Sequence, residues 1–321
     1  MNTLSSTCKV CNTKNENKTF LVKEMMYGTR EKFLYFQCTT CKCLQINEVP
    51  DNLHDHYPTA YYSLDEFKDK RFEGTFGNIK KSLYKASALN KGILKHFYKV
   101  TEFQFLKHLN INTTSKILDV GCGNGRNFLH PLAEVGFTNL LGCDPYLSKG
   151  LSYDNGLKIL KKEVFDISTK WDLITYHHVF EHLENPLEHL HKIYDLLEED
   201  GVCVLRIPTV SSYAWEHYKE NWVQLDAPRH LFLHSTESLK ILSEKSNFTI
   251  DKILYDSTNF QFIGSENYIK DIPLNQKKDK RFFKKLKRKY QKATYNIKAK
   301  NLNKNNLGDQ AIYILRKRRF K

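Results

Sequence analysis

The stretch Ile117-Leu118-Asp119-Val120-Gly121-Cys122-Gly123-Asn124-Gly125 decides the fold class of this chain. An apolar run leads directly into three glycines, and a helix is expected to follow at 127–132. Glycine at such a turn adopts positive φ and lets the backbone approach a ligand closely. The pattern therefore predicts a strand, a tight turn and a helix, with a ligand bound at the carboxyl end of the strand.

Short apolar runs alternate with amphipathic segments on both sides of this stretch. Such alternation predicts an α/β fold in which helices cover a doubly wound sheet. We expect a seven-strand Rossmann-like sheet over 111–321, preceded by a loop and helical connector over 51–110. The runs that we interpret as strands are ILDVG, LLGCD, LKIL, WDLITY, VCVLRI, FTIDKIL and AIYILRK.

A glycine-rich turn of this kind is typical of proteins that bind either a dinucleotide or another adenosine-containing cofactor. Dinucleotide-binding turns read G-x-G-x-x-G, but Arg126 occupies the sixth position here, which argues against an NAD-linked oxidoreductase. Asp144 ends the next apolar run, where a carboxylate can accept hydrogen bonds from both hydroxyls of a ribose. These features suit S-adenosylmethionine (SAM), which carries adenosine but no pyrophosphate. The predicted cofactor contacts are Asp119, Gly121, Gly123, Gly125, Asp144 and Asp166.

With these residues the chain resembles the class I SAM-dependent methyltransferases. Three later blocks are similar to that family in the same order, although Asp200 stands where a second glycine is usual. The third block resembles a loop of a bacterial subgroup that often carries an N-terminal zinc module. The resemblance implies a small polar methyl acceptor, often a sugar or nucleotide-linked sugar of surface polysaccharide biosynthesis. The blocks are WDLI with HVFEHLENP, LLEEDG with VCVLRIP, and WVQLDAPRHL.

Five of the eight cysteines lie within the first 43 residues. Two C-x2-C pairs, each on a tight turn, predict a tetrahedral zinc site, with a redox-active pair as the less favoured alternative. Four protein ligands leave no open coordination position, so we expect a structural ion in a zinc-ribbon-like module over 1–50. Cys43 is a further thiol that competes for the fourth position. The predicted ligands are Cys8, Cys11, Cys38 and Cys41.

The exit of the fourth predicted strand is where a catalytic base is expected. Methyl transfer to a hydroxyl or a carbon acid requires removal of a proton from the acceptor. His178 is the first candidate for this base and His182 the second. The alternative is that Glu181 and His182 cap and brace the next helix.

Residues 208–235 are predicted to form a lid over the acceptor, because they combine aromatic with polar side chains. A salt bridge between Asp226 and Arg229 that only fixes the loop is the alternative interpretation. The predicted acceptor contacts are Trp222, Asp226, Arg229 and His230.

The net charge of +14 is concentrated near the C-terminus. Residues 277–300 carry 12 Lys/Arg and one Asp, and 301–321 carry six Lys/Arg and one Asp, which leaves 1–276 at −2. Proteins that wrap nucleic acid more often spread a basic face over the fold, so nucleic acid is disfavoured as a partner. Within the basic insertion at 271–308, an apolar stripe predicts a helix that packs on the domain or, alternatively, contacts an anionic membrane. The stripe is Phe282, Leu286, Tyr290, Ala293 and Ile297.

The N-terminus lacks the apolar core of a signal peptide, and no run approaches the length of a membrane-spanning helix, so a cytoplasmic location is expected. The predicted function is a SAM-dependent methyltransferase that acts on a small polar acceptor. The alternatives are a non-catalytic module that recruits partners through the zinc ribbon and the basic helix, and the NAD-linked oxidoreductase.

Overall fold

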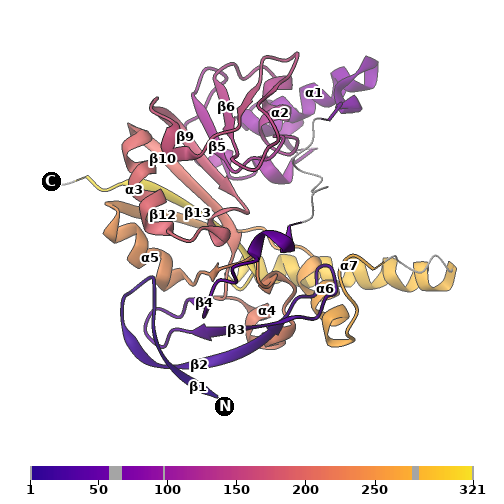
Figure 1. Ribbon diagram of the computed structural model, residues 1–321. Helices are drawn as coiled ribbons and strands as arrows, with labels where there is room; N and C mark the ends of the chain where they lie inside the picture. Colours follow the sequence, from indigo (N-terminus) through magenta and orange to yellow (C-terminus); the bar gives the residue numbers. More distant parts are fainter. Residues whose placement is uncertain (1, 58–66, 97, 277–281, 320–321) are drawn as a thin grey trace.

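The large sheet is organised around the strand that precedes the three glycines. The computed structural model describes residues 2–57, 67–96, 98–276 and 282–319, with the backbone alone described for 282–287. Strand β5, Ile117–Val120, lies inside an eight-stranded sheet of order β12-β13-β10-β9-β5-β6-β8-β7 (Figure 1). Strands β10, β9, β5, β6 and β8 are parallel, and β13 runs antiparallel between β10 and β12.

All seven predicted strands are present, and the predicted α/β sheet is confirmed. The eighth strand, β7, is a two-residue edge strand antiparallel to β8, too short for the alternation from which strands are predicted. The bounds of the other strands are β6 Leu140–Cys143, β7 Leu151–Ser152, β8 Lys158–Leu160, β9 Trp171–His177, β10 Leu197–Pro208, β12 Phe248–Tyr255 and β13 Gln310–Lys317.

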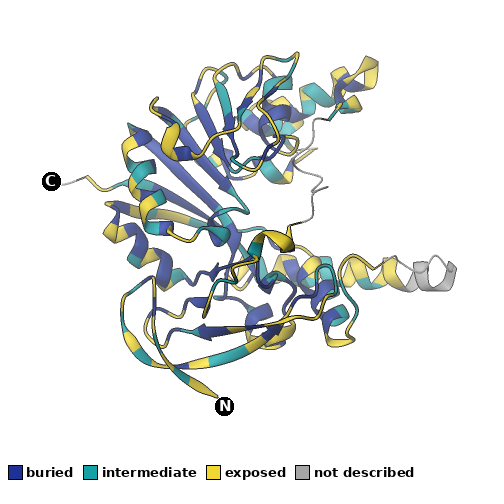
Figure 2. Ribbon diagram, viewed as in Figure 1, coloured by how far each residue is buried: buried dark blue, intermediate teal, exposed yellow. Residues whose placement is uncertain are grey.

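Helices cover both faces of this sheet, because side chains alternate between the faces along each buried strand. Ile117 and Leu173 belong to one core with Leu129 of α2, whereas Leu118 and Ile174 belong to a second core with helices α3 and α5. The helices are α1 Gly74–Leu89, α2 Leu129–Glu134, α3 Pro186–Leu196, α4 Tyr213–Tyr218, α5 Thr236–Lys245, α6 Phe260–Ile269 and α7 Phe282–Lys304. Figure 2 shows the buried strands between the more exposed helices.

The N-terminal residues form a second, antiparallel sheet of order β1-β2-β3-β4-β11. Its last strand, β11, comes from the predicted lid and pairs with β4 through Phe232 and Leu233. The side chains of this sheet belong to the same core as one face of the large sheet, so the N-terminal segment packs onto the lid (Figure 1). The strands are β1 Thr3–Thr7, β2 Lys14–Lys23, β3 Lys32–Gln37, β4 Leu44–Ile46 and β11 Phe232–Leu233.

Helix α7 packs on the domain through a different face from the one predicted. Tyr290 and Ile297 of the predicted stripe are exposed, whereas Ala299 is buried and Tyr295 lies 4.9 Å from the ring of Phe262. The side chains of Phe282 and Leu286 lie outside the described residues. Among the helices of the described ranges, none combines the length and apolar composition that are needed to cross a membrane.

Candidate functional site

The glycine turn follows β5 and lies beside the carboxyl end of the neighbouring strand β6, where Gly121 N–H donates to the carbonyl of Cys143. Gly121 has a φ of +66°, and a Cβ on it would lie 2.6 Å from the side chain of Val179, which follows β9. Asp144, directly after β6, accepts hydrogen bonds from the backbone N–H of Gly123 at 2.9 Å and of Tyr146 at 2.9 Å. The turn, the acidic residue and the segment after β9 therefore meet at one end of the sheet, as predicted for parallel neighbours.

The predicted cofactor carboxylates differ in their surroundings. Burial raises the pKa of Asp144, whose two oxygens still have one free lone pair each for a ribose hydroxyl. Asp119 is buried and accepts a hydrogen bond from the Thr175 hydroxyl at 2.7 Å, and burial raises its pKa to about 7. Asp166, in a short 3-10 turn after β8, is exposed. Burial, then the charges of Asp119 and Asp144 and last that of Asp166, raise the pKa of Cys143 at the end of β6. The predicted cofactor residues thus gather around the ends of β5, β6 and β8.

Three imidazoles surround one buried carboxylate, two of them from the segment after β9 and the third, His230, from the loop before β11. The Glu181 side chain is fully buried, with His178 Nδ1 3.6 Å and His230 Nε2 3.9 Å from its Oε1 atom. A carboxylate oxygen of Glu181 and one ring nitrogen each of His182 and His230 all lie within 4.8 Å of one another. Burial raises the pKa of Glu181, but the three neighbouring imidazoles outweigh burial and lower it to about 2. We call Glu181, His182 and His230 the Glu-His-His cluster.

Backbone carbonyls hold two of these imidazoles by their Nδ1 atoms. His182 Nδ1 lies 2.8 Å from the carbonyl oxygen of Arg229, and His230 Nδ1 lies 2.8 Å from the carbonyl oxygen of Gln224. A carbonyl oxygen only accepts hydrogen bonds, so each Nδ1 must carry a proton. The lone pair of each neutral ring is therefore on Nε2. Burial and the neighbouring His182 lower the pKa of His230 to about 4, so it is neutral at physiological pH.

His178 differs from the residues of the Glu-His-His cluster in being partly accessible. Its backbone has a φ of 58°, an unusual value for a residue other than glycine, directly after the last residue of β9. Its side chain is 39% exposed, and its backbone N–H donates to the carbonyl of Arg206. His177, which precedes it, is directed to the other side and packs against Phe105 and Phe128. His178 is therefore the accessible imidazole at the exit of β9.

Two tyrosines link the region of Asp144 with the histidines. The Tyr57 hydroxyl lies 3.3 Å from His182 Nδ1, and its ring is stacked with that of Tyr146, 6.4 Å between centroids. Tyr146 follows Asp144 by two positions and is 81% exposed. Neither tyrosine is among the site residues that the sequence predicts. Tyr57 lies in the segment HDHYPTAYYS, residues 54–63, whose unusual composition is its only sign of a function. Its position next to the histidines could not be predicted, because it is far from them in the sequence.

The predicted acceptor residues are more buried than a lid would require. Trp222 is fully buried and donates from Nε1 to Asp309 at 3.0 Å. Arg229 is 1% exposed and contacts Asp226 at 2.5 Å and Glu24 at 3.1 Å. The polar groups of Trp222 and Arg229 are thus bonded inside the protein, and acceptor contact by these two residues stays a prediction. Asp226 is partly accessible, and the buried His230 belongs to the Glu-His-His cluster.

The four predicted cysteine ligands come together at the turns before β2 and β4. Cys8 Sγ lies 3.5 Å from Cys41 Sγ, and Cys11 Sγ lies 3.6 Å from Cys38 Sγ. Ligands of a tetrahedral ion with Zn–S bonds of about 2.3 Å lie about 3.8 Å apart, close to these separations. The hydrogen bond with Cys41 lowers the pKa of Cys8 to about 5. The four residues can therefore hold a zinc ion.

Cys43 is separate from this group. It is fully buried, and its Sγ lies 3.6 Å from the Leu233 carbonyl and 4.0 Å from His234 Nδ1. The group that the described residues form contains Cys8, Cys11, Cys38 and Cys41 but not Cys43. The position of Cys43 beside Leu233 and His234 therefore favours Cys8, Cys11, Cys38 and Cys41 as the predicted ligands.

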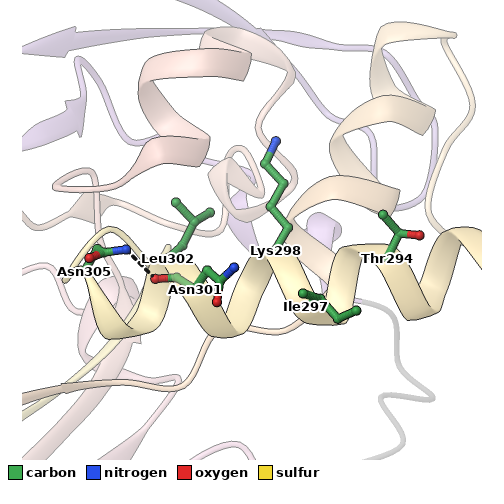
Figure 3. A pocket seen from close by; sticks show the side chains of 6 residues that line it. All are labelled: Thr294, Ile297, Lys298, Asn301, Leu302 and Asn305. Carbon is green, nitrogen blue, oxygen red and sulfur yellow. Dashed lines mark hydrogen bonds between the residues drawn. The ribbon is translucent and has the colours of Figure 1, made fainter.

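A surface pocket beside α7 is unrelated to this chemistry. Five of its six lining residues come from α7, and the sixth, Asn305, directly follows that helix (Figure 3). One of them, Lys298, already contacts Tyr213, with its ammonium 3.1 Å from the hydroxyl and 4.4 Å from the ring centroid. None of the lining residues belongs to the glycine turn or to the Glu-His-His cluster.

Comparison with known proteins identifies the large domain. Residues 94–253 match a protein family described as "Methyltransferase domain". No curated protein matches the chain.

Among solved structures, the chain is similar to a SAM-dependent methyltransferase from Thermotoga maritima, with 17% identity, a TM-score of 0.43, and coverage of 75% of this chain and 95% of that chain. A cyclopropane synthase from Mycobacterium tuberculosis has 13% identity, a TM-score of 0.42, and coverage of 83% and 94%. A SAM-dependent methyltransferase from Archaeoglobus fulgidus has 21% identity, a TM-score of 0.39, and coverage of 64% and 86%. At these values nothing about the acceptor follows from them. From the family match together with the strand order and the glycine turn, the chain carries a class I SAM-dependent methyltransferase domain.

Proposed function

We propose that this methyltransferase acts on a small polar acceptor with a nucleophilic hydroxyl, and that His178 is its catalytic base. The observation that supports this most directly is the position of His178, accessible at the exit of β9 and beside the turn that holds Gly121. The resemblance to zinc-bearing bacterial methyltransferases favours a sugar or nucleotide-linked sugar as the acceptor. Polar side chains around a partly exposed histidine suit such a molecule.

SAM, when bound, supplies a methyl group on a positively charged sulfur, so that the protein needs only to align and deprotonate the acceptor. Asp144 would hold the ribose hydroxyls with its free lone pairs, and the glycine turn would lie against the methionine part. Tyr146, exposed beside Asp144, is placed to cover the adenine side.

The base is assigned from the orientation of its ring. His178 Nδ1 faces Glu181 at 3.6 Å, which leaves Nε2 to take the proton of the acceptor hydroxyl. The negative Glu181 stabilises the imidazolium that forms, in the way that a buried carboxylate supports a general base. His182 is the second candidate, through its Nε2 atom. Tyr57 and Asp226 are the proposed side chains that orient the acceptor, because both lie beside the histidines.

We further propose that the cysteine group holds a structural zinc ion. Besides the sulfur separations, Gln45 Nε2 donates to Cys8 Sγ at 3.1 Å, and the Thr13 hydroxyl lies 3.0 Å from Cys11 Sγ. Such surrounding hydrogen bonds orient thiolate ligands. Four protein ligands leave no position for substrate, so the ion would brace the N-terminal sheet against the lid.

Calorimetric titration with SAM, and separately with NAD, tests the assignment of the cofactor. We expect micromolar SAM binding, no heat with NAD, and loss of SAM binding in Asp144→Ala. Asp154→Ala, a change of the same kind on a surface turn, is the control and should bind SAM normally. A folded protein that does not bind SAM would refute the methyltransferase function and favour the interaction-module alternative.

A further inference from the structure

We infer that Glu181, His182 and His230 form a binding site for a divalent first-row transition-metal ion, separate from the cysteine group. The inference deepens the proposed function and rests on it for the ion's role, which is to bind and activate the acceptor hydroxyl. Two imidazoles and one carboxylate are a donor set typical of such ions, and three protein ligands leave coordination positions open.

The strongest observation is the state of the Glu181 carboxylate. It is fully buried, and among the described residues neither of its oxygens has a hydrogen-bond partner. A buried carboxylate without partners is strongly unfavourable in an apolar environment. The nearest nitrogens, at 3.6 Å on His178 and 3.9 Å on His230, are too distant for hydrogen bonds. A cation between the carboxylate and the imidazoles supplies the missing interaction.

The two histidines are prepared as ligands. Their Nδ1–H groups donate to the carbonyls of Arg229 and Gln224, both at 2.8 Å, so that in the neutral ring the lone pair lies on Nε2, where a metal ion can bind. Ligating histidines in proteins are usually held in this way by a hydrogen bond on the other ring nitrogen. Ligand atoms on one ion with bonds of about 2.1 Å lie about 3.0 to 3.5 Å apart. The 3.9 Å between His230 Nε2 and Glu181 Oε1 therefore requires only a small contraction.

The surrounding charges favour a cation. Arg229 contacts two carboxylates, Glu24 and Asp226, so one negative charge remains even before Glu181 is counted. Asp226 Oδ2 also lies 3.9 Å from His230 Nε2, on the same side as Glu181. A divalent ion would balance the two excess negative charges of this buried region. The site thus differs from an exposed acidic cluster, where water would screen each carboxylate.

A metal ion at this site would change the role expected for His182 but not that for His178. His182 becomes a ligand and is no longer available as a base, while His178 remains the residue that takes the proton. A bound ion lowers the pKa of an oxygen that it coordinates, so the acceptor hydroxyl would lose its proton more readily. Acceptors with two adjacent oxygen donors, such as a sugar diol, would fit the open positions well.

The test is a titration of the zinc-loaded full chain with Co²⁺, followed by calorimetry and visible absorption. We expect one equivalent to bind with the weak absorption of nitrogen and oxygen ligands, without the intense thiolate-to-cobalt band that the cysteines would produce. Glu181→Gln, which preserves shape, and His230→Ala should each weaken binding by more than about tenfold. His191→Ala, on the exposed face of α3, is the matched control and should leave Co²⁺ affinity unchanged.

Thermal unfolding in the presence of a chelator separates a lost ligand from a lost fold. Glu181→Gln should unfold at or above the wild-type temperature without metal, and only the wild type should gain stability when Co²⁺ is added. Absence of Co²⁺ binding, a thiolate band, or unchanged affinity in Glu181→Gln would overturn the inference. SAM titration is independent of these results, so a failed metal site and a failed methyltransferase function are distinguishable.

Discussion

Glu24 and Arg229 form a buried ion pair, 3.1 Å apart, although 205 positions separate them in the sequence. Glu24 follows the second strand of the N-terminal sheet, and Arg229 immediately precedes His230. Arg229 also donates to the carbonyl of His56, and the Tyr35 hydroxyl donates to the carbonyl of His230 at 2.8 Å. The N-terminal sheet therefore holds the segment that presents His230 to Glu181.

Removal of the Arg229 charge should destabilise the protein strongly. Arg229→Met leaves Glu24 and Asp226 buried without their cation, and loss of one partner of a buried pair typically costs about 3 to 5 kcal/mol. Urea unfolding measures this difference. Arg316→Met, which breaks the exposed pair with Asp251 at 3.1 Å, is the control and should cost less than about 1 kcal/mol. Equal effects of the two substitutions would contradict the structural role given to Arg229.

The cysteines should differ in their effect on zinc content. Cys38→Ser removes a proposed ligand and is expected to reduce bound zinc from one equivalent to none, with a lower unfolding temperature, because metal binding is coupled to folding. Cys43→Ser changes an equally buried thiol outside the group and should retain the zinc. Metal analysis of purified protein measures both. Loss of zinc from Cys43→Ser alone would mean that the ligand assignment is wrong.

The contact between Gly121 and Val179 should appear in a double-mutant cycle. Gly121→Ala strains a residue with φ +66° and places a methyl group 2.6 Å from Val179, so we expect destabilisation and weaker SAM binding. Gly156→Ala has a similar φ of +86° with no atom within 4 Å, and it measures the backbone strain alone, about 1 kcal/mol. Val179→Ala should rescue part of the Gly121→Ala effect. Additive effects of the two changes would show that no close contact exists.

Asp119 should make the stability of the ligand-free protein depend on pH. Burial raises the pKa of Asp119 to about 7, above its ordinary value of 3.8. Between these values the folded state holds a proton that the unfolded state has released, so stability falls as the pH rises from about 4 to 7 and then levels. Asp119→Asn should flatten this dependence in urea titrations across that range. A wild-type slope that Asp119→Asn leaves unchanged would assign the effect to another group.

Helix α7 offers a test of peripheral membrane contact. Tyr290 and Ile297 are exposed on a strongly basic helix, which is the arrangement of an amphipathic segment at an anionic surface. We expect binding to phosphatidylserine vesicles at low salt, none to neutral vesicles, and at least partial loss in Tyr290→Ser/Ile297→Ser. The exposed Tyr98→Ser provides a comparison for loss of an aromatic side chain elsewhere. Failure to sediment with anionic vesicles at low salt would exclude the membrane interpretation.

Local sequence determined the strands, the glycine turn and the cysteine pairs. ILDVG and AIYILRK are apolar because both faces of their strands are buried, and that requirement is visible in any short window. The spacing of Cys8 and Cys11 reflects a turn that a few residues define by themselves. Local sequence also predicted the position of Asp144, because a charged residue that ends an apolar run lies at the carboxyl end of the buried strand.

Only the tertiary structure decided how distant side chains are paired. Trp222 and Arg229 are residue types that often bind polar ligands. In the fold, however, Trp222 donates a hydrogen bond to Asp309 and Arg229 pairs with Glu24. In the same way, the burial of Glu181 beside His182 and His230 depends on the lid, which a strand of the N-terminal sheet holds in place. A local sequence pattern shows which side chains of a strand or helix are buried. Ion pairs and sets of metal ligands join segments that are far apart in the sequence, and no local pattern shows that such segments are close in space.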